Sequence, residues 1–244
     1  MAVMSNSMNT ATWWRRPWIA PLFGVVMIFI AFSLPPYLTG DPAASRVPQP
    51  AGFAAHYPML VAHVTFGTVA LVAVCLQIWP WFRTRYPAAH RRVGRIYVFG
   101  GVLPGALVAL PIGAMSPFGP VARVSNVLLA SLWLVCTFVG YRMARHRRYV
   151  EHRRWMIRSF ALTASIITNR IWAGVVYLAL APELHTTFGG SEHLLQTTAA
   201  SLATWLGWVV LLLFAEWWLE RDVTTRRASR AHAIPLSTPG ASSL

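Results

Sequence analysis

Six long apolar stretches, separated by short polar segments, follow one another along the chain. Each comes close to the roughly 20 mostly apolar residues that a helix needs to cross a bilayer. The pattern therefore predicts an all-α, polytopic membrane protein with six transmembrane helices. The expected spans are residues 18–34, 57–82, 93–115, 122–144, 155–180 and 194–219.

Two of these spans carry additional signals. The first apolar run is long and no small-residue cleavage site follows it, so we expect a retained helix rather than a signal peptide. The third span contains Pro104 and Pro111, which predict a kink. Its glycines Gly101 and Gly105 have the spacing of helices that pack closely in membranes.

The distribution of arginine predicts the orientation of the spans. Eighteen of the 21 arginines flank the spans on one side, two lie on the other side, and Arg170 lies within the fifth span. Because basic loops stay in the cytoplasm, we expect both termini there. Residues 1–17 would form a cytoplasmic segment, residues 18–220 a membrane domain, and residues 221–244 a cytoplasmic tail. The Arg, Ser, Thr and Pro content of that tail predicts disorder.

The composition narrows the class of protein. Only 11% of the residues are charged and 56% are hydrophobic, whereas a soluble domain carries about 25% charged residues. An arginine belt at the inner leaflet accounts for the net charge of +14, so the expected partners are the bilayer and its anionic lipid headgroups, not nucleic acid. The two cysteines indicate neither a disulfide nor a metal site. Without a known catalytic motif, we assign no catalytic residues and leave open whether the protein is an enzyme.

The triplet His-Arg-Arg stands near the starts of both the third and the fifth span, at His90 and at His152. The similar pentapeptides LVAVC (71–75) and LWLVC (132–136) precede the triplets at nearly the same offset. This pattern suggests a parallel repeat of two helical hairpins. The alternative explanation is chance, or a shared need for arginines at the inner surface.

Polar and small side chains form lines along three of the predicted helices. At about 100° per residue, one face of the fifth span carries His152, Ser159, Thr163 and Arg170. The second span carries His63, Gly67, Ala70 and Gln77, and the fourth carries Asn126, Ala130, Trp133 and Thr137. We expect these lines to face one another around a shared interior. The alternative is that they serve only as hydrogen-bonding contacts between helices.

The candidate cofactor-binding residues are His63, His90 and His152, because imidazole is a common haem ligand. A b-type haem fits between His90 and His152 if the third and fifth spans adjoin, with arginines near its propionates. No second histidine lies within another span to partner His63. The candidate ligand-binding residues are Gln77, Arg95, Arg158 and Arg170. The arginines of the triplets could instead anchor the chain to lipid phosphates.

Several of these residues belong to strings that resemble a known family. The strings are His63 with Gly67, Gln77, H-R-x-x-G-R-x-Y (90–97), H-R-R-W-M-I-R-S-x-A (152–161) and Arg170-Ile171-Trp172. Together they resemble the bacterial multi-pass membrane proteins called domain of unknown function 2306, over about residues 57–175. The resemblance implies a location in the bacterial inner membrane but no particular activity.

These observations lead to an expectation about function. We expect an integral membrane protein that binds a cofactor or small ligand among its second, third, fourth and fifth spans. Three alternatives stay open: a b-type haem or quinone redox protein, a transporter or anion- or lipid-binding protein, and a structural subunit of a membrane complex. An oligomer is compatible with each of them.

Overall fold

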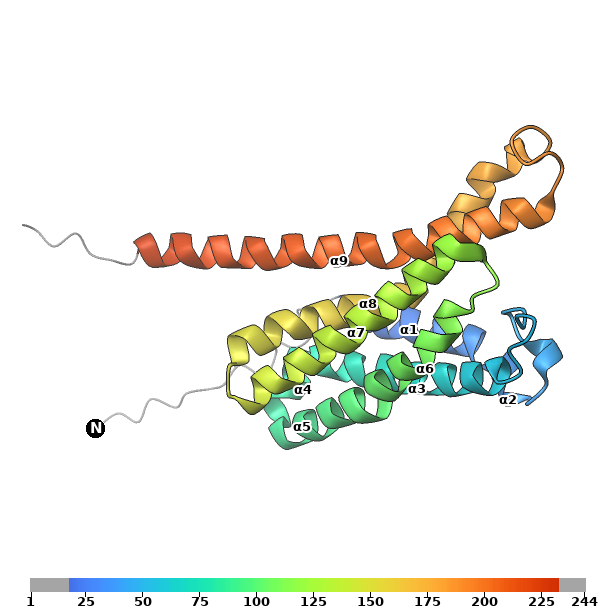
Figure 1. Ribbon diagram of the computed structural model, residues 1–244. Coiled ribbons are helices and arrows are strands. Elements are labelled where there is room, and N and C mark those ends of the chain that lie inside the picture. The colour runs from blue at the N-terminus through green and yellow to red at the C-terminus, as the bar shows by residue number, and fades with distance from the viewer. Residues whose placement is uncertain (1–17, 233–244) are drawn as a thin grey trace, which may run out of the picture.

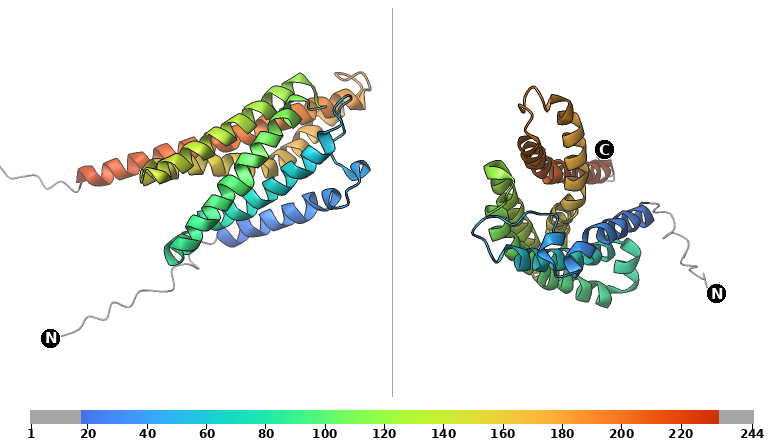
Figure 2. Two further views of the ribbon diagram at one scale, coloured as in Figure 1. Left: turned by 60° about the horizontal axis from the view of Figure 1, so that its bottom comes forward. Right: turned by 90° about the vertical axis from the view of Figure 1, so that its right-hand side faces the viewer.

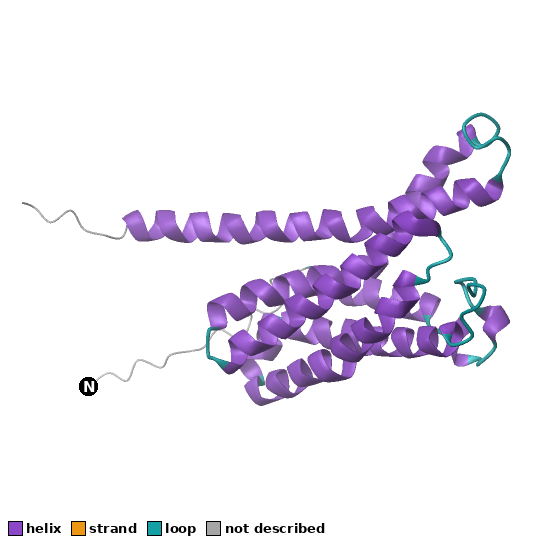
Figure 3. Ribbon diagram, viewed as in Figure 1, coloured by secondary structure: helices purple, strands orange, loops and turns teal. Residues whose placement is uncertain are grey.

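A computed structural model describes the backbone of residues 18–232 (Figure 1). Residues 1–17, expected as a cytoplasmic segment, and residues 233–244 of the expected tail lie outside the described residues. In the described part every regular element is helical, which confirms the all-α prediction (Figure 3). The elements are α1 (Ile19–Ser33), α2 (Pro35–Leu38), η2 (Pro42–Ala44), α3 (His56–Ile78), α4 (Pro80–Arg85), α5 (Pro87–Arg95), η3 (Ile96–Val102), α6 (Leu103–Ala114), α7 (Gly119–Arg145), α8 (Tyr149–Leu180), η4 (Ala181–Glu183) and α9 (Glu192–His232).

Five helical segments of the described chain are long and apolar enough to cross a membrane. They are His56–Ile78, Pro87–Ala114, Gly119–Arg145, Tyr149–Glu183 and Glu192–Arg221. Helix α1 is apolar but has only 15 residues. At 1.5 Å per residue it measures about 22 Å, less than the roughly 30 Å of a hydrocarbon core. The structure therefore supports a multi-span membrane protein, while the sixth span stays a prediction.

The long helices lie side by side and alternate in direction (Figure 2). Helix α3 packs against the segment formed by α5, η3 and α6, that segment packs against α7, α7 against α8, and α8 against α9. Helix α1 lies on the α3 side of the bundle. The start of α1, the α4–α5 region, the turn between α7 and α8 and the far end of α9 all lie at one end (Figure 2). We call it the arginine-rich end, and the opposite one the arginine-poor end.

The long helical segment Pro87–Ala114 contains a π-helical stretch, η3. The N–H of Leu103 donates to the carbonyl of Val98, five residues earlier. The next residue, Pro104, has no N–H, and in an α-helix its ring would clash with the carbonyl of Gly100. A wider turn relieves this clash, so the irregularity predicted around Pro104 takes the form of a π-helix.

Glycines allow the closest helix contacts. A Cβ added to Gly101 would lie 3.0 Å from Cα of Ala70 on α3, and a Cβ on Gly207 would lie 2.9 Å from Cα of Asn169 on α8. Backbone atoms cannot move aside as a flexible side chain can, so both positions exclude any larger residue. The close packing expected at Gly101 is confirmed.

Helix α9 continues past the predicted end of the last span at residue 219 and reaches His232. It thus includes residues 221–232 of the segment whose composition predicts disorder. A helix that is already nucleated extends at low cost through residues such as Arg and Ala, which favour helix.

Candidate functional site

Polar side chains follow the interior of the bundle in three groups, from the arginine-rich end towards the opposite end. The first group is the histidine cluster, formed by Gln77, His90 and His152. The second is the hydroxyl network, formed by Tyr97, Trp133, Thr137, Ser159 and Thr163. The third is His63 with the backbone of Gly105. From Gln77 to His63 along α3 the distance is about 21 Å at 1.5 Å per residue.

The histidine cluster joins α3, α5, α7 and α8. Nε2 of Gln77 donates to the backbone carbonyl of His90 at 3.0 Å. Nδ1 of His152 lies 2.8 Å from the carbonyl of Gly140 on α7. Because a carbonyl can only accept, Nδ1 of His152 donates this hydrogen bond.

A tight turn between α7 and α8 brings His152 to Gly140. Arg147 adopts a left-handed conformation with φ of 59°, which is uncommon for a residue other than glycine. The N–H of Arg148 then donates to the carbonyl of Met143 at 2.9 Å. This arrangement closes the end of α7 in the manner of a Schellman motif and starts α8 directly afterwards.

His90 carries the least satisfied atom of the cluster. Its Nδ1 is buried and has no hydrogen-bond partner in the described structure. His152, Arg83 and Arg91 all lie near enough to interact electrostatically with it. Leaving a buried polar atom unpaired costs about 1–3 kcal/mol, so such an atom calls for an explanation, such as a bound water or ligand.

Two glycines make room for the cluster. A Cβ on Gly94 of α5 would lie 3.2 Å from Oε1 of Gln77. A Cβ on Gly140 of α7 would lie 2.8 Å from Sδ of Met156 and 3.2 Å from Cβ of Trp155. Trp155 and Met156 of α8 therefore pack directly against Gly140, and the histidine cluster is held by close packing of the helices.

The hydroxyl network lies in the centre of the bundle and is buried throughout. The hydroxyl of Tyr97, on η3, lies 2.6 Å from Oγ of Ser159 and 2.7 Å from Oγ1 of Thr163, both on α8. From α7, Nε1 of Trp133 donates to Oγ1 of Thr163 at 2.9 Å. Oγ1 of Thr137 lies 2.6 Å from Oγ of Ser159. The phenol thus connects η3 directly to α8, and α7 joins the network through Trp133 and Thr137.

The network has fewer hydrogens than contacts. Backbone carbonyls of Trp133 and Ser159 accept from Thr137 and Thr163, which adds two contacts to the four between side chains. Four hydroxyls and one indole N–H supply five hydrogens for these six contacts. The hydrogens can therefore be distributed in more than one way over the same heavy atoms. At each end of the network a backbone carbonyl accepts the last hydrogen bond. A carbonyl takes up no proton, so the network is suited to holding helices together.

His63 lies beyond the network. Its Nδ1 is 3.0 Å from the carbonyl of Gly105 on α6, and Gly105 itself packs against the ring of Trp133. As at His152, Nδ1 donates this hydrogen bond to a carbonyl, which can only accept. One turn further along α3, a Cβ on Gly67 would meet no atom within 4 Å.

The structure brings some predicted site residues together and separates others. Gln77 bonds to the backbone of His90, and His152 is near enough to His90 to interact with it electrostatically. Arg158 instead pairs with Glu216 of α9, where Nη2 lies 2.8 Å from Oε2, and its guanidinium stacks 4.9 Å from the ring of Trp155. Arg95 is exposed on α5, and Arg170 is exposed on α8.

The shared interior expected from the three polar lines forms in part. Trp133 and Thr137 of α7 do meet Ser159 and Thr163 of α8. The line of polar residues on α8 leaves the interior of the bundle before it reaches Arg170, which is exposed. At the arginine-poor end α8 turns away from α3 together with the start of α9 (Figure 1), so the same helix face is no longer covered there.

Sequence reasoning missed three buried polar residues. Tyr97 ends the string H-R-x-x-G-R-x-Y. A tyrosine within a span needs a hydrogen-bond partner for its hydroxyl, and this need is the signal in the sequence that marks it as a site residue. Trp208 of α9 donates to Oγ of Ser125 at 2.9 Å. His56, the first residue of α3, is only 1% exposed.

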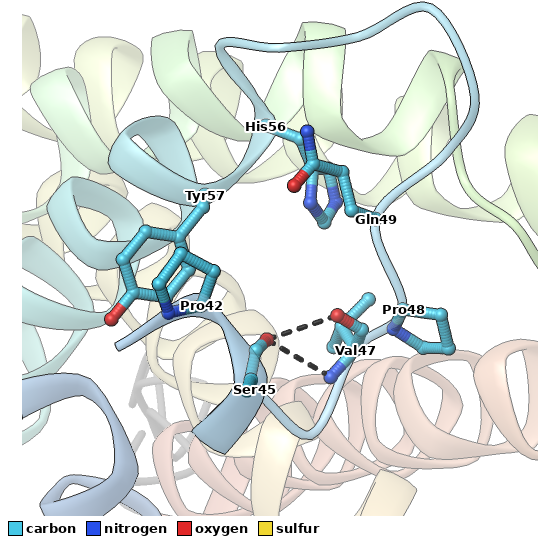
Figure 4. Close-up of a pocket in the computed structure, with 8 residues that line it drawn as sticks. Pro42, Ser45, Val47, Pro48, Gln49, His56 and Tyr57 are labelled. Atoms are coloured by element: carbon cyan, nitrogen blue, oxygen red, sulfur yellow. Dashed lines mark hydrogen bonds between the residues drawn. The ribbon is translucent and has the colours of Figure 1, made fainter. Parts of the chain in front are cut away.

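His56 helps to line a pocket of about 200 Å³ at the arginine-poor end (Figure 4). The loop between α2 and α3 folds over the start of α3, and the imidazole ring points towards the middle of the pocket, whereas the phenol of Tyr57 points away from it (Figure 4). Nε2 of His56 and the hydroxyl of Tyr57 are both buried without a partner in the described structure. The other lining residues are Pro42, Ala43, Ser45, Val47, Pro48 and Gln49.

Within the described residues, no group of three His, Cys, Asp or Glu side chains is arranged to hold a metal ion. The sequence model of the family described as "Predicted membrane protein (DUF2306)" matches residues 60–219, which run from α3 into α9. Comparison with curated proteins and with solved structures gives no match. The match covers the histidine cluster, the hydroxyl network and His63, and it extends past the strings that carried the resemblance.

Proposed function

Because the chain belongs to the DUF2306 family of predicted membrane proteins, we propose that it is a six-span protein of the bacterial inner membrane with both termini in the cytoplasm. The arginine-rich turns, the start of α1 and the end of α9 share one end of the bundle (Figure 2), which supports this orientation. Helix α1 would then cross the bilayer together with α2.

We further propose that the protein binds a small ligand or cofactor at the histidine cluster. The observation that carries this proposal is the buried Nδ1 of His90, which has no hydrogen-bond partner in the described structure. His152 is near enough to interact with it electrostatically. A ligand that donates a hydrogen bond, or a metal centre, would satisfy that nitrogen. Gln77 would support the site by holding the backbone of His90.

Native mass spectrometry of the purified protein tests this proposal. We expect a co-purifying small molecule in the wild type that is absent from His90→Gln and reduced in His152→Gln. His146→Gln, which changes an exposed histidine in the α7–α8 turn, serves as the control and should keep the molecule. The same set of bound species in all four proteins would rule out a site at the histidine cluster.

A b-type haem is the second candidate, because His152 is oriented by a hydrogen bond from its Nδ1 to the carbonyl of Gly140. Histidines that bind a metal are commonly held in this way through the ring nitrogen that does not bind the metal. His90 and His152 would hold the haem, which would supply one-electron redox chemistry. Protein purified from haem-replete cells should then show a Soret band that His90→Ala and His152→Ala abolish. A colourless preparation would exclude the haem and leave the wider proposal to the mass spectrometry.

A further inference from the structure

A pair of arginines lies at the arginine-poor end of the bundle, far from the histidine cluster. Arg46 is anchored to the end of α1 although it comes from the loop between α2 and α3. Its Nη2 donates to the carbonyl of Phe32 at 2.9 Å, and its guanidinium carbon lies 3.7 Å above the centre of the Phe32 ring. A cation at this position satisfies an unpaired carbonyl and is favoured by the helix dipole.

The anchoring of Arg46 leaves most of its hydrogen-bonding capacity unused. A guanidinium group has five N–H donors, and the one bond to Phe32 is its only hydrogen bond within the described structure. The remaining donors are held in a fixed position by the ring and the carbonyl. A preorganised guanidinium of this kind is suited to bind an anion with two parallel hydrogen bonds.

Arg170 of α8 reaches the same place. Ile166 and Ile167, one turn before it, pack against the buried cluster of Val26, Leu71 and Cys75, which also contacts Phe29 and Ile30 of α1. Since α1 and α8 run in the same direction, Arg170 lies at the level of the last turn of α1, where Arg46 is anchored. The charges of Arg46 and Arg170 are close enough to interact, and Tyr37 is also within electrostatic reach of Arg170.

Within the described residues, no carboxylate neutralises this pair. Arg170 makes no ion pair or hydrogen bond with any described residue, although an arginine within a span is costly without a partner. The acidic residue of the same loop, Asp41, is engaged locally: its Oδ1 accepts from the N–H of Ala43 at 2.9 Å. Two adjacent cations without a carboxylate repel one another and favour a shared anion.

The surroundings of the pair indicate where that anion would come from. Phe32, Leu38 and Ile171 are 54%, 72% and 60% exposed, so the two guanidinium groups stand within an apolar surface of the kind that faces lipid. A phosphate that carries acyl chains matches both the charge and the apolar surroundings. Arginine binds phosphate with short, charge-assisted hydrogen bonds.

We propose that Arg46 and Arg170 together bind a phosphate group, carried by a glycerophospholipid of the leaflet at the arginine-poor end. This site is separate from the histidine cluster, and each proposal can fail without the other. Arg46 would be the fixed half of the site, and Arg170 would close on the phosphate from α8.

Lipid titration of the purified full-length protein, followed by native mass spectrometry, tests the proposal with three probes. The probes are phosphatidylglycerol, a diacylglycerol with the same acyl chains, and inorganic phosphate. We expect phosphatidylglycerol to bind about tenfold more weakly to Arg170→Gln and to Arg46→Gln, the loss of one charge-assisted contact. Diacylglycerol should bind weakly and equally to all variants, and Arg170→Lys should retain part of the affinity.

Arg123→Gln is the matched control, because Arg123 also lies at the arginine-poor end and donates to a backbone carbonyl, that of Ser116, at 2.9 Å. Its phosphatidylglycerol affinity should equal that of the wild type. Binding of inorganic phosphate that depends on both arginines, without a preference for phosphatidylglycerol, would assign the same site to a soluble anion. Equal affinity of the wild type and Arg170→Gln for both phosphate probes would overturn the proposal.

Discussion

Tyr97 connects η3 to α8 through a single hydroxyl group. That hydroxyl contacts Ser159 and Thr163 within a region that is fully buried. Tyr97→Phe removes one of the five hydrogens but leaves each contacted oxygen with another partner. We therefore expect a moderate loss of about 1–2 kcal/mol in the free energy of unfolding, measured by thermal or denaturant unfolding in detergent.

Tyr141→Phe is the control for this change. The hydroxyl of Tyr141 accepts only an exposed contact at 3.3 Å from Arg145, so its loss should alter stability by less than about 0.5 kcal/mol. Equal unfolding free energies of the two variants would show that the hydroxyl network contributes no stability of its own.

At the scale of helices, the contact between α8 and α9 is governed by Gly207. The Cβ of Gly207→Ala would lie 2.9 Å from both Cα and Cβ of Asn169, and the neighbouring bond from Thr168 to the carbonyl of Gly207 would be strained. Overpacking of this kind costs about 1–3 kcal/mol. Gly174→Ala on α8, where a Cβ would meet no atom within 4 Å, should be neutral in the same unfolding assay.

The ion pair between Arg158 and Glu216 also joins α8 to α9. Glu216→Gln would leave a partly buried guanidinium without its counter-charge. Because the Glu216 side chain is 38% exposed, we expect a loss of about 1–2 kcal/mol, below that of a fully buried pair. Glu151→Gln, which removes the exposed partner of Arg148, should change the unfolding transition little. A loss in the control as large as in Glu216→Gln would contradict this explanation.

Hydropathy predicted the helical elements well because every long span is apolar over most of its length. It was less accurate at their ends. The second span was expected to reach residue 82, but α3 ends at Ile78, since Trp79 precedes Pro80 and is forced into an extended conformation with ψ of 110°. Helix α8 begins at Tyr149 rather than 155 because its first turns are charged but still helical.

The candidate site was predictable only in part, for geometric reasons. Helical periodicity placed Ser159 and Thr163 of α8 on one face, and they do meet residues of α7. The same arithmetic could not place Tyr97, because a π-helix changes the angle between successive residues. Helical periodicity also could not predict that Arg170 is exposed, because the helices that cover α8 change along its length.

At the scale of the whole molecule, the orientation in the membrane is the main prediction. In a background with Cys75→Ala and Cys136→Ala, which removes both buried thiols, a membrane-impermeant maleimide should label Thr186→Cys in intact cells. It should label Arg147→Cys only after the membrane is opened, because positively charged turns stay in the cytoplasm. Labelling of Arg147→Cys in intact cells would reverse the proposed orientation.

The π-helix has a consequence for how the two ends of the molecule are related. In an uninterrupted α-helix, the rotational phase of α5 would fix that of α6. The wider turn of η3 adds an offset, so that Gly94 can face Gln77 while Gly101 and Gly105 face Ala70 and Phe66 of the same partner helix. Removing one residue from η3 would turn α6 by about 100° relative to α5. Insertions and deletions should therefore be less tolerated here than in the loops, because the phase offset keeps both halves of this helix in register with α3.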